Sequence, residues 1–319
     1  MKVVRVLVWV AAALVLVVNG ASAYVRLAQQ GVGCTPWPQC YGQAAPQDAG
    51  AVPAEDSPHF YVRATHRLAA SFAGVLFLAI AFLGWPAWRS AAPRIAAVGL
   101  LALAAFLAWL GRYTPSLVPA VTIGNVVAGA ATFGLLAWLA AWRPEVAGTA
   151  ANDPLARGLA RLTAAALAVA VIQVALGALA NARYVAAACE GFPSCGGAWW
   201  PPAGAGMGFD IFAATAVPLA AAEAAGREAV QLAHRLGAVA VAALAFLTAV
   251  AALRRAAGVR AAALVLLALV AGQFVLGVVI VSAGAPLATS VAHNVISSLA
   301  LGALAWLHCR ARQEKESHR

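Results

Sequence analysis

The chain has 319 residues, of which 63% are hydrophobic and only 10% are charged. Its mean hydropathy is +0.84, whereas a soluble domain is about 45–50% apolar. The composition therefore excludes a soluble globular protein and indicates a membrane protein with several spans. The formal net charge of +10 at pH 7 would suit a nucleic-acid partner, unless the basic residues are concentrated on one side of a membrane.

Eight apolar stretches are each long enough, at about 20 residues, to cross a bilayer as a helix. In chain order they cover roughly residues 3–25, 62–85, 93–111, 116–142, 157–181, 229–253, 259–282 and 286–308. The first could be a signal peptide, but its apolar run exceeds the roughly 7–15 residues of such a segment. We therefore expect an all-α membrane protein with eight transmembrane helices, the first of them uncleaved.

Basic side chains collect on one side of these spans. With the N-terminus inside, the cytoplasmic side carries 14 of the 21 lysines and arginines: Lys2, Arg5, Arg89, Arg94, Arg143, Arg157, Arg161, Arg254, Arg255, Arg260, Arg310, Arg312, Lys315 and Arg319. This is the positive-inside distribution. It accounts for the basic balance without nucleic acid, and it predicts a bacterial cell membrane, in contact with lipid, with both termini in the cytoplasm.

Two parts of the chain repeat each other. "THRLAAS", with His66 and Arg67, matches "AHRLGAV", with His234 and Arg235, and the same offset carries Asn125 onto His293. A second alignment joins "NGASAYVRL" to "LGALANARY". We expect two tandem four-helix bundles, residues 1–142 and 157–319, joined by a cytoplasmic linker at 143–156. Because each has an even number of spans, both enter the membrane in the same direction, related by a pseudo-two-fold axis along the membrane normal.

Two histidines, His234 and His293, lie at matched depth in the sixth and eighth spans, about 10 Å from the outer surface at 1.5 Å per residue. An ionisable group inside a span is costly and usually functional. Imidazoles that face each other across a bundle core suit a six-coordinate haem iron, although they also suit a hydrogen-bonded pair. Zinc would need more ligands than these two, so the pattern favours haem.

Arg67 and Arg235 directly follow His66 and His234. A guanidinium binds a carboxylate through a bidentate fork, so both arginines are candidates for haem propionates, with snorkelling to the interface as the alternative. In the N-terminal bundle His66 stands at the position of His234, but Asn125 stands at that of His293. That bundle offers one histidine and an open position opposite, which suits a substrate porphyrin rather than a fixed electron carrier.

Four of the five cysteines lie in two outer loops. Cys34 and Cys40 lie in "GCTPWPQC", and Cys189 and Cys195 lie in "CEGFPSC" with the same spacing. Disulfides persist on the outer side, whereas zinc more often uses closer cysteines and further ligands. We expect an intraloop disulfide in each loop, closing a lid over its own bundle. A thiol-exchange role for the first pair stays open, and Cys309 is expected to be a free thiol.

Nearly the whole chain resembles the haem A synthase family, which supplies haem A to cytochrome c oxidase. The resemblance rests on the eight spans, the two halves, "YVRLAQQGVGCTPWPQCYGQ", "CEGFPSC" and the two His-Arg-Leu motifs. It implies haem b as the cofactor, with its iron bound by His234 and His293. It also implies that His66 holds the iron of the substrate, haem O, whose C8 methyl group this haem-dependent oxidoreductase converts to a formyl group.

Two positions depart from the family pattern. Asn125 stands where members usually carry a histidine, and Arg63 stands where they carry a glutamate, three residues before His66. A general acid or base at the substrate site would then be water or a loop group such as Glu55 or Asp56. The departures suggest, as an alternative, a haem-binding paralogue that assembles or transfers haem without oxidase chemistry.

The leading prediction is an enzyme that converts haem O to haem A. Haem O synthase and cytochrome c oxidase assembly factors are then the expected protein partners, and a homo-oligomer is left open. A transporter, for which parallel repeats are also known, is disfavoured by the scarcity of charge inside the spans.

Overall fold

The structure is a computed structural model that describes residues 2–43, 59–143, 154–254 and 257–313. Its long helices are α1 (Lys2–Gln29), α2 (Phe60–Gly84), α3 (Ala91–Leu110), α4 (Pro119–Ala141), α5 (Pro154–Ala182), α6 (Ala224–Leu253), α7 (Ala257–Ser282) and α8 (Leu287–Gln313). These eight helices of the described chain are long and apolar enough to cross a membrane. The predicted all-α class with eight spans is confirmed.

Helix ends follow local signals more closely than hydropathy. The Ser90 hydroxyl caps α3 by accepting a hydrogen bond from the backbone nitrogen of Ala92 at 3.4 Å, as expected for serine at this position. Pro119 opens α4, where a missing N–H costs nothing. α6 begins at Ala224 and α8 continues to Gln313, beyond the predicted residues 229 and 308, because a helix with charged, helix-favouring residues continues past the apolar core.

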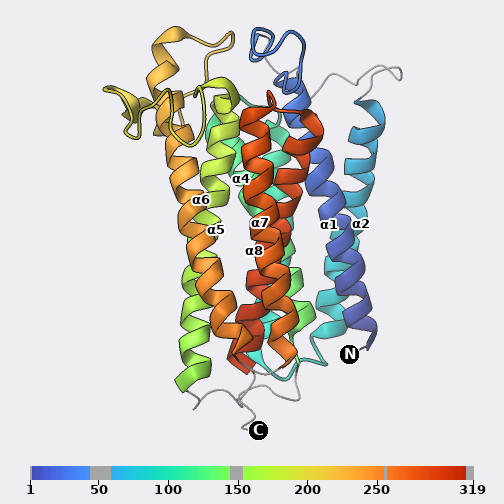
Figure 1. Cartoon of the computed structure of the whole chain (residues 1–319). Coiled ribbons are helices and arrows are strands. Elements are labelled where there is room, and N and C mark those ends of the chain that lie inside the picture. Colours follow the sequence, from blue (N-terminus) through green and yellow to red (C-terminus); the bar gives the residue numbers. More distant parts are fainter. Residues whose placement is uncertain (1, 44–58, 144–153, 255–256, 314–319) are drawn as a thin grey trace.

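The long described connections lie at one end of the molecule, which we call the loop end. Residues 30–43 and 183–223 are there, with the short 3-10 turns η3 (Val185–Ala187), η4 (Ala205–Phe209) and η5 (Ala221–Glu223); the turn η1 (Gly111–Tyr113) follows α3 at the same end. α1 begins and α8 ends at the opposite end, which we call the terminal end (Figure 1).

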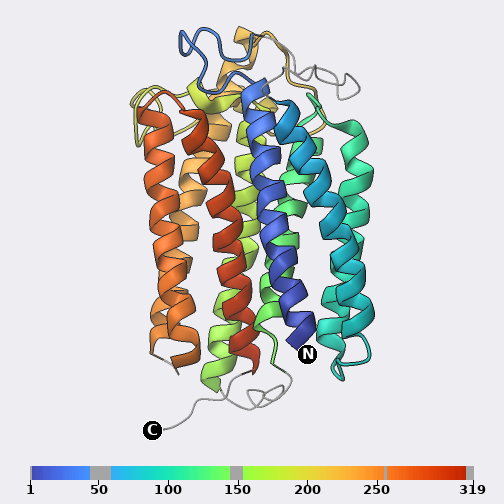
Figure 2. The ribbon, with the colours of Figure 1, turned by 90° about the vertical axis from the view of Figure 1, so that its right-hand side faces the viewer.

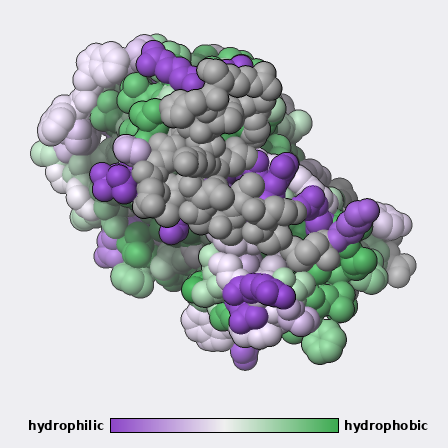
Figure 3. All heavy atoms as spheres, turned by 90° about the horizontal axis from the view of Figure 1, so that it is seen from below, coloured by the Kyte–Doolittle hydropathy of each residue, from purple (hydrophilic) through white to green (hydrophobic). Residues whose placement is uncertain are grey.

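Charge separates these two ends. Hydrophilic side chains gather on the face of the terminal end (Figure 3), where basic residues occupy the helix ends. The carboxylates of the described residues, Glu190, Asp210, Glu223 and Glu228, all belong to the loop end. The side of the membrane on which each end lies stays a prediction.

The helix contacts follow two runs of four helices, α1 to α4 and α5 to α8, which we call the first and the second group. In the first group α1 packs on α2, α2 on α3, α3 on α4 and α4 on α1, and α5 to α8 repeat this order in the second group. The groups meet where α4 packs on α8 and α5, and where α1 packs on α8. Figure 2 shows α1 with α8 on one side and α2 on the other. The predicted linker falls between the groups, although its residues 144–153 lie outside the described residues. The pseudo-two-fold relation stays a prediction.

A glycine permits the closest approach between the groups. A Cβ on Gly302 of α8 would lie 2.4 Å from Cε1 of Phe133 on α4, and the Phe133 side chain is buried. Small residues at a helix crossing allow such contact within a membrane. The contact fixes α8, which carries His293, against the first group.

The described part of the first loop, residues 30–43, lies on the second group of helices. A Cβ on Gly33 would lie 3.1 Å from the backbone nitrogen of Leu287, the first residue of α8, and a Cβ on Gly284 would lie 3.2 Å from the Trp37 ring. Gly33 has a φ of +75°, a conformation that glycine adopts readily. The described part of this loop therefore lies on the second group, whereas the sequence predicts a lid over its own bundle.

A buried apolar cluster explains where the first loop lies. Val32 and Tyr41 of the loop pack with Tyr184 and Ala285 of the second group, and Trp37 lies against this cluster. The rings of Tyr41 and Tyr184 lie 5.7 Å apart between centroids. Burial of large aromatic side chains is strongly favourable, and this cluster, which also contains Ala23 and Leu27 of α1, provides it across the two groups.

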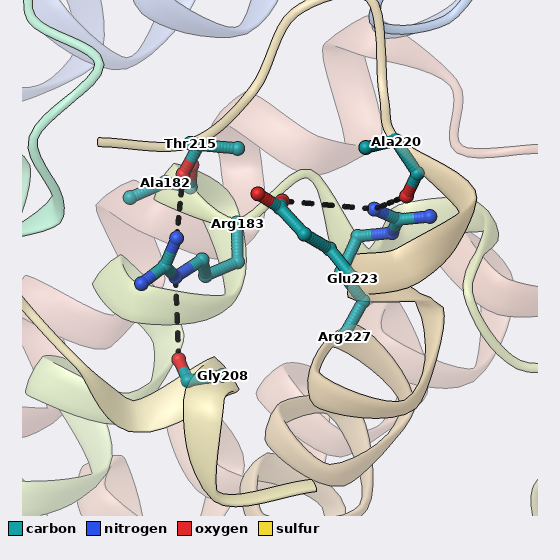
Figure 4. Close-up of polar contacts among 7 residues, drawn as sticks. All are labelled: Ala182, Arg183, Gly208, Thr215, Ala220, Glu223 and Arg227. Atoms are coloured by element: carbon teal, nitrogen blue, oxygen red, sulfur yellow. Dashed lines mark hydrogen bonds and ion pairs between the residues drawn. The ribbon is translucent and has the colours of Figure 1, made fainter. Parts of the chain in front are cut away.

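The second loop reaches the first group in return. The backbone nitrogen of Ala120, in α4, donates to the carbonyl of Ile211 at 2.8 Å, and that of Thr215 donates to the carbonyl of Leu117 at 2.9 Å. Arg183 holds this loop by donating to Gly208 O and Thr215 Oγ1, both at 3.3 Å (Figure 4). The two loops thus join the groups at the loop end.

Candidate functional site

His234 of α6 and His293 of α8 face each other inside the second group. Their ring centroids lie 6.4 Å apart and their planes are inclined by 70°. A metal ion midway between two imidazoles, at about 2.0–2.1 Å from each coordinating nitrogen, separates the ring centres by about 6 Å. The spacing therefore suits two axial ligands of one metal ion, and the structure brings together the two histidines that the sequence predicts as a pair.

A cavity of about 470 Å³ surrounds the two imidazoles. Its walls come from all four helices of the second group and are mostly apolar, with amides and hydroxyls contributed by Gln173, Asn181, Gln231, Gln273, Ser290, Asn294 and Ser297. This volume lies within the range of about 300–1,000 Å³ that is usual for cofactor sites. Leu236, Val239 and Phe274 line the cavity and are also exposed on the surface, so the cavity approaches the lipid between α6 and α7.

Both loops contribute to the loop end of this cavity. Tyr41 and Val32 come from the first loop, and Phe192, Pro193 and Trp199 come from the second. The Tyr41 hydroxyl is neutral at physiological pH even at the ordinary tyrosine pKa of about 10, and burial raises its pKa further. Covering one end of the cavity with apolar and neutral groups keeps its dielectric constant low.

Small and polar neighbours set the positions of the two imidazoles. The Gln173 side-chain nitrogen lies 3.0 Å from His234 Nδ1 and donates to the His234 carbonyl at 2.8 Å. Gly177 and Gly277 leave room beside the rings, because a Cβ on them would lie 3.0 Å from Cε1 of His234 and 3.5 Å from Cε1 of His293. Nδ1 of His293 is buried without a hydrogen-bond partner among the described residues. One ring nitrogen therefore remains available for a ligand.

Arg235 connects the second loop to the cavity, which its side chain lines. Its Nη1 donates to the carbonyls of Pro193 and Ser194 at 3.1 and 2.6 Å, and its guanidinium lies 5.6 Å from the ring centre of Phe192. Nε and Nη2 are buried and have no hydrogen-bond partner within the described ranges. These two nitrogens form the edge of a guanidinium that receives a carboxylate in bidentate fashion, so the predicted role of Arg235 has a structural basis.

The N-terminal residues form a less complete arrangement. His66 lies on the face of α2 that also carries Ala69 and Ala73, two buried residues, whereas the neighbouring Arg67 is exposed. Asn125 of α4 is partly buried, and no hydrogen bond or ring contact joins it to His66 in the described chain. Nε of Arg63 is buried without a partner in the same part of the chain. Glu55 and Asp56 lie outside the described residues.

Both predicted disulfides are present, Cys34–Cys40 and Cys189–Cys195, and Cys309 is a free, buried cysteine. The first pair lies on the second group of helices, not above the N-terminal bundle, because its loop crosses over. The sequence instead predicts this pair above the substrate site. Cys189 and Cys195 pack against Leu232 of α6, in their own half.

Sequence reasoning missed several residues around the histidines, above all Gln173, Asn181 and Asn294. All three are amides inside apolar spans, and such residues are enriched where a membrane protein needs internal hydrogen bonds. That signal marks them as candidates, but only the packing of helices shows which histidine each one serves.

Comparison with known proteins decides the family. The model of the cytochrome oxidase assembly protein family COX15-CtaA matches residues 5–305. The chain belongs to this family. A haem A synthase of Shewanella oneidensis is 29% identical over 293 residues, which are 88% of this chain and 88% of that protein. A haem A synthase of Methylobacterium sp. (strain 4-46) is 30% identical, with 96% of this chain and 91% of that protein covered.

Membership of the COX15-CtaA family confirms the predicted resemblance. The match spans both groups of helices and both cysteine loops, so neither half of the chain is an addition to the family pattern. Both relatives are named as enzymes of haem A synthesis.

Proposed function

We propose that this COX15-CtaA member is a haem A synthase, a membrane oxidoreductase that converts the C8 methyl group of haem O to a formyl group for cytochrome c oxidase. Family membership supports the reaction class. The observation that carries the proposal is the histidine pair in the cavity of α5 to α8, with 6.4 Å between ring centroids.

In this proposal haem b is the resident cofactor of the second group, bound by His234 and His293. The buried, unpartnered Nδ1 of His293 and the space kept by Gly177 and Gly277 support this assignment. When bound, the haem would supply one-electron redox chemistry, with His234 and His293 holding its iron. The edge of Arg235 formed by Nε and Nη2 would hold a propionate.

The protein's own contribution at this site is orientation and exclusion of water. Gln173 restrains this part of α6 by donating to the His234 carbonyl, and its side-chain nitrogen packs 3.0 Å from Nδ1 of the ring. Tyr41 and Phe192 help to close the loop end. Each of these effects favours a rigid site of low dielectric constant.

The first group would bind the substrate, haem O. His66 is the candidate for the substrate iron, with Arg67 toward the propionates, as the repeat with His234 and Arg235 suggests. Asn125 would leave the opposite side of the porphyrin without a strong ligand, since an amide is a poor ligand for iron. Oligomerisation and contacts with haem O synthase or oxidase assembly factors belong to the same proposal.

The orientation and symmetry of the molecule are part of the same proposal. The terminal end, with its basic residues, would face the cytoplasm of a bacterial cell by the positive-inside rule. The two groups would be copies of one four-helix unit, related by a pseudo-two-fold axis. The matching order of helix contacts in the two groups supports this duplication.

A second candidate function is haem binding for oxidase assembly or transfer, without oxidation. Asn125 and Arg63 favour it, because they replace the expected histidine and glutamate and leave no carboxylate within α2 or α4. Such a protein would keep the histidine pair of the second group and bind haem O in the first group unchanged.

Extraction of haems separates the two functions. The full-length protein is expressed with a haem O synthase in a host that makes no haem A, and the extracted haems are resolved by chromatography. Haem A is the expected product. Haem b together with unmodified haem O would contradict the synthase and support the assembly or transfer protein, with an Asn125→His variant as a matched test of whether the missing ligand restores oxidation.

A further inference from the structure

Arg26 belongs to α1 of the first group, yet its guanidinium lies between the two groups. Its Nε donates to Oδ1 of Asn181 on α5 at 2.8 Å, and its Nη2 donates to Oδ1 of Asn294 on α8 at 3.1 Å. Gln30 holds Asn181 as well, accepting from its Nδ2 at 2.8 Å and donating to its carbonyl at 3.2 Å. α1 thus fixes two amide side chains of the second group.

Both asparagines line the cavity of the histidine pair. Asn294 directly follows His293 in α8, and its Nδ2 also donates to the carbonyl of Ser290 at 2.9 Å. Asn181 lies one helical turn beyond Gly177, the residue that packs beside the His234 ring. Arg26 therefore acts on the site through a residue next to one histidine and a residue near the other.

The charge of Arg26 is not balanced by a carboxylate in the described part of the chain, where the ion pair found is Arg227–Glu223 at 3.9 Å (Figure 4). A guanidinium is charged at neutral pH, and its acceptors here are neutral amides. In surroundings of low dielectric constant such a charge acts over a longer distance than in water. It favours reduced iron over oxidised iron, because reduction removes one positive charge from the metal.

We propose that Arg26 is a positioning residue of the haem site. It is contributed by the first group, it fixes the part of α8 that carries His293, and it raises the reduction potential of a haem bound in the second group. The inference rests on the proposed function, since it requires a haem between His234 and His293.

Arg183, which the repeat aligns with Arg26, has a different environment. It is 4% exposed and is enclosed by the second loop, where it donates to Gly208 O and Thr215 Oγ1 (Figure 4). Neither acceptor lines the histidine cavity. Arg183 therefore holds the second loop, whereas Arg26 contacts two residues that line the histidine cavity.

The test is a redox titration of the haem in purified full-length protein, comparing the parent with Arg26→Gln, Arg26→Lys and Asn294→Asp. For Arg26→Gln the ratio of reduced to oxidised haem at a fixed solution potential should fall on the order of tenfold, which is the effect of removing a unit charge that acts over about 10 Å at an effective dielectric constant of about 20. This fall is about 59 mV for one electron.

The other variants separate charge from packing. Arg26→Lys should stay near the parent potential because it keeps the charge, whereas Asn294→Asp should lower the potential because a carboxylate of equal size neutralises Arg26. The double variant Arg227→Gln with Glu223→Gln is the matched control: it removes both partners of an ion pair, so the net charge is unchanged, and it should leave the potential unchanged.

An unchanged potential in Arg26→Gln and Asn294→Asp, with haem still bound, would overturn this inference and leave the proposed function standing. An equal fall in the double variant Arg227→Gln with Glu223→Gln would overturn it as well, because the effect would not depend on Arg26. If Arg26→Gln loses its haem, Asn294→Asp and Arg26→Lys decide the question. A parent protein without haem would overturn the proposed function and this inference together.

Discussion

Gly177 of α5 is where the smallest added side chain should disturb the histidine pair most. A Cβ there would lie 3.0 Å from Cε1 of His234, whereas a Cβ on Gly277 would lie 3.5 Å from Cε1 of His293. Carbon atoms prefer a separation of about 3.5–4.0 Å. Gly177→Ala must therefore displace the His234 ring by a few tenths of an ångström, while Gly277→Ala makes an ordinary contact.

The displacement has a cost that can be converted to affinity. Inserting a carbon into a packed site costs about 1–3 kcal/mol, and 1.4 kcal/mol corresponds to a tenfold change in a dissociation constant. Gly177→Ala should thus weaken haem b binding by about 5- to 150-fold, and it also strains the contact between Gln173 and His234 Nδ1. Gly277→Ala should stay within about threefold of the parent.

The assay is a titration of haem-depleted, detergent-solubilised full-length protein with haem b, followed by the absorbance of the low-spin complex. The two alanine variants differ from the parent by the same single methyl group, so the comparison isolates the 3.0 Å contact. Equal losses in the two variants, or parent-like binding by Gly177→Ala, would refute the reasoning.

Three further outcomes are expected. Arg235→Gln should weaken haem b binding about tenfold or more, because charge-assisted hydrogen bonds contribute about 1.5–3 kcal/mol. The variant should bind haem b dimethyl ester, which has no free propionate, as tightly as the parent does. An equal loss of affinity for the ester would count against a propionate contact. Gly302→Val should lower the free energy of unfolding by about 1–3 kcal/mol, as measured by denaturant titration. The control is Gly272→Val, because a Cβ at Gly272 meets nothing within 4 Å. Equal effects of the two substitutions would contradict the tight crossing of α4 and α8. Cys34→Ser combined with Cys40→Ser should speed the transfer of haem b to apomyoglobin, because the first loop covers the second group, and an unchanged rate would argue against that cover.

Hydropathy predicts the eight spans because the bilayer imposes the same length and apolarity on each helix. The same reasoning places His234 and His293 at one depth, and a four-helix ring then brings them together. The pair was predictable because His234 and His293 lie on helices of one group. Within four helices that follow one another in the chain, few residues lie at the same membrane depth as either histidine.

Contacts between the two groups were not predictable in this way. In the sequence, Arg26 is a residue near the outer end of the first span, and Asn181 and Asn294 are isolated amides. Hydropathy does not show that α1 packs on α8, or that α4 packs on both α5 and α8. The repeat even misleads for the first loop. It suggests a lid on its own bundle, whereas burial of Tyr41 against Tyr184 draws the loop to the other group.

Arg63 and Asn125 are the two departures from the family pattern. The sequence identifies them against the family pattern, and the structure shows no contact between Asn125 and His66 among the described residues.

The electron paramagnetic resonance spectrum of the oxidised full-length protein is the most direct test of whether His234 and His293 hold a haem. The parent, expressed without haem O synthase, should give the low-spin signal of an iron with two imidazole ligands. His66→Ala should keep that signal, and His234→Ala and His293→Ala should each lose it. A low-spin signal that survives in both His234→Ala and His293→Ala, or that disappears in His66→Ala, would contradict the account.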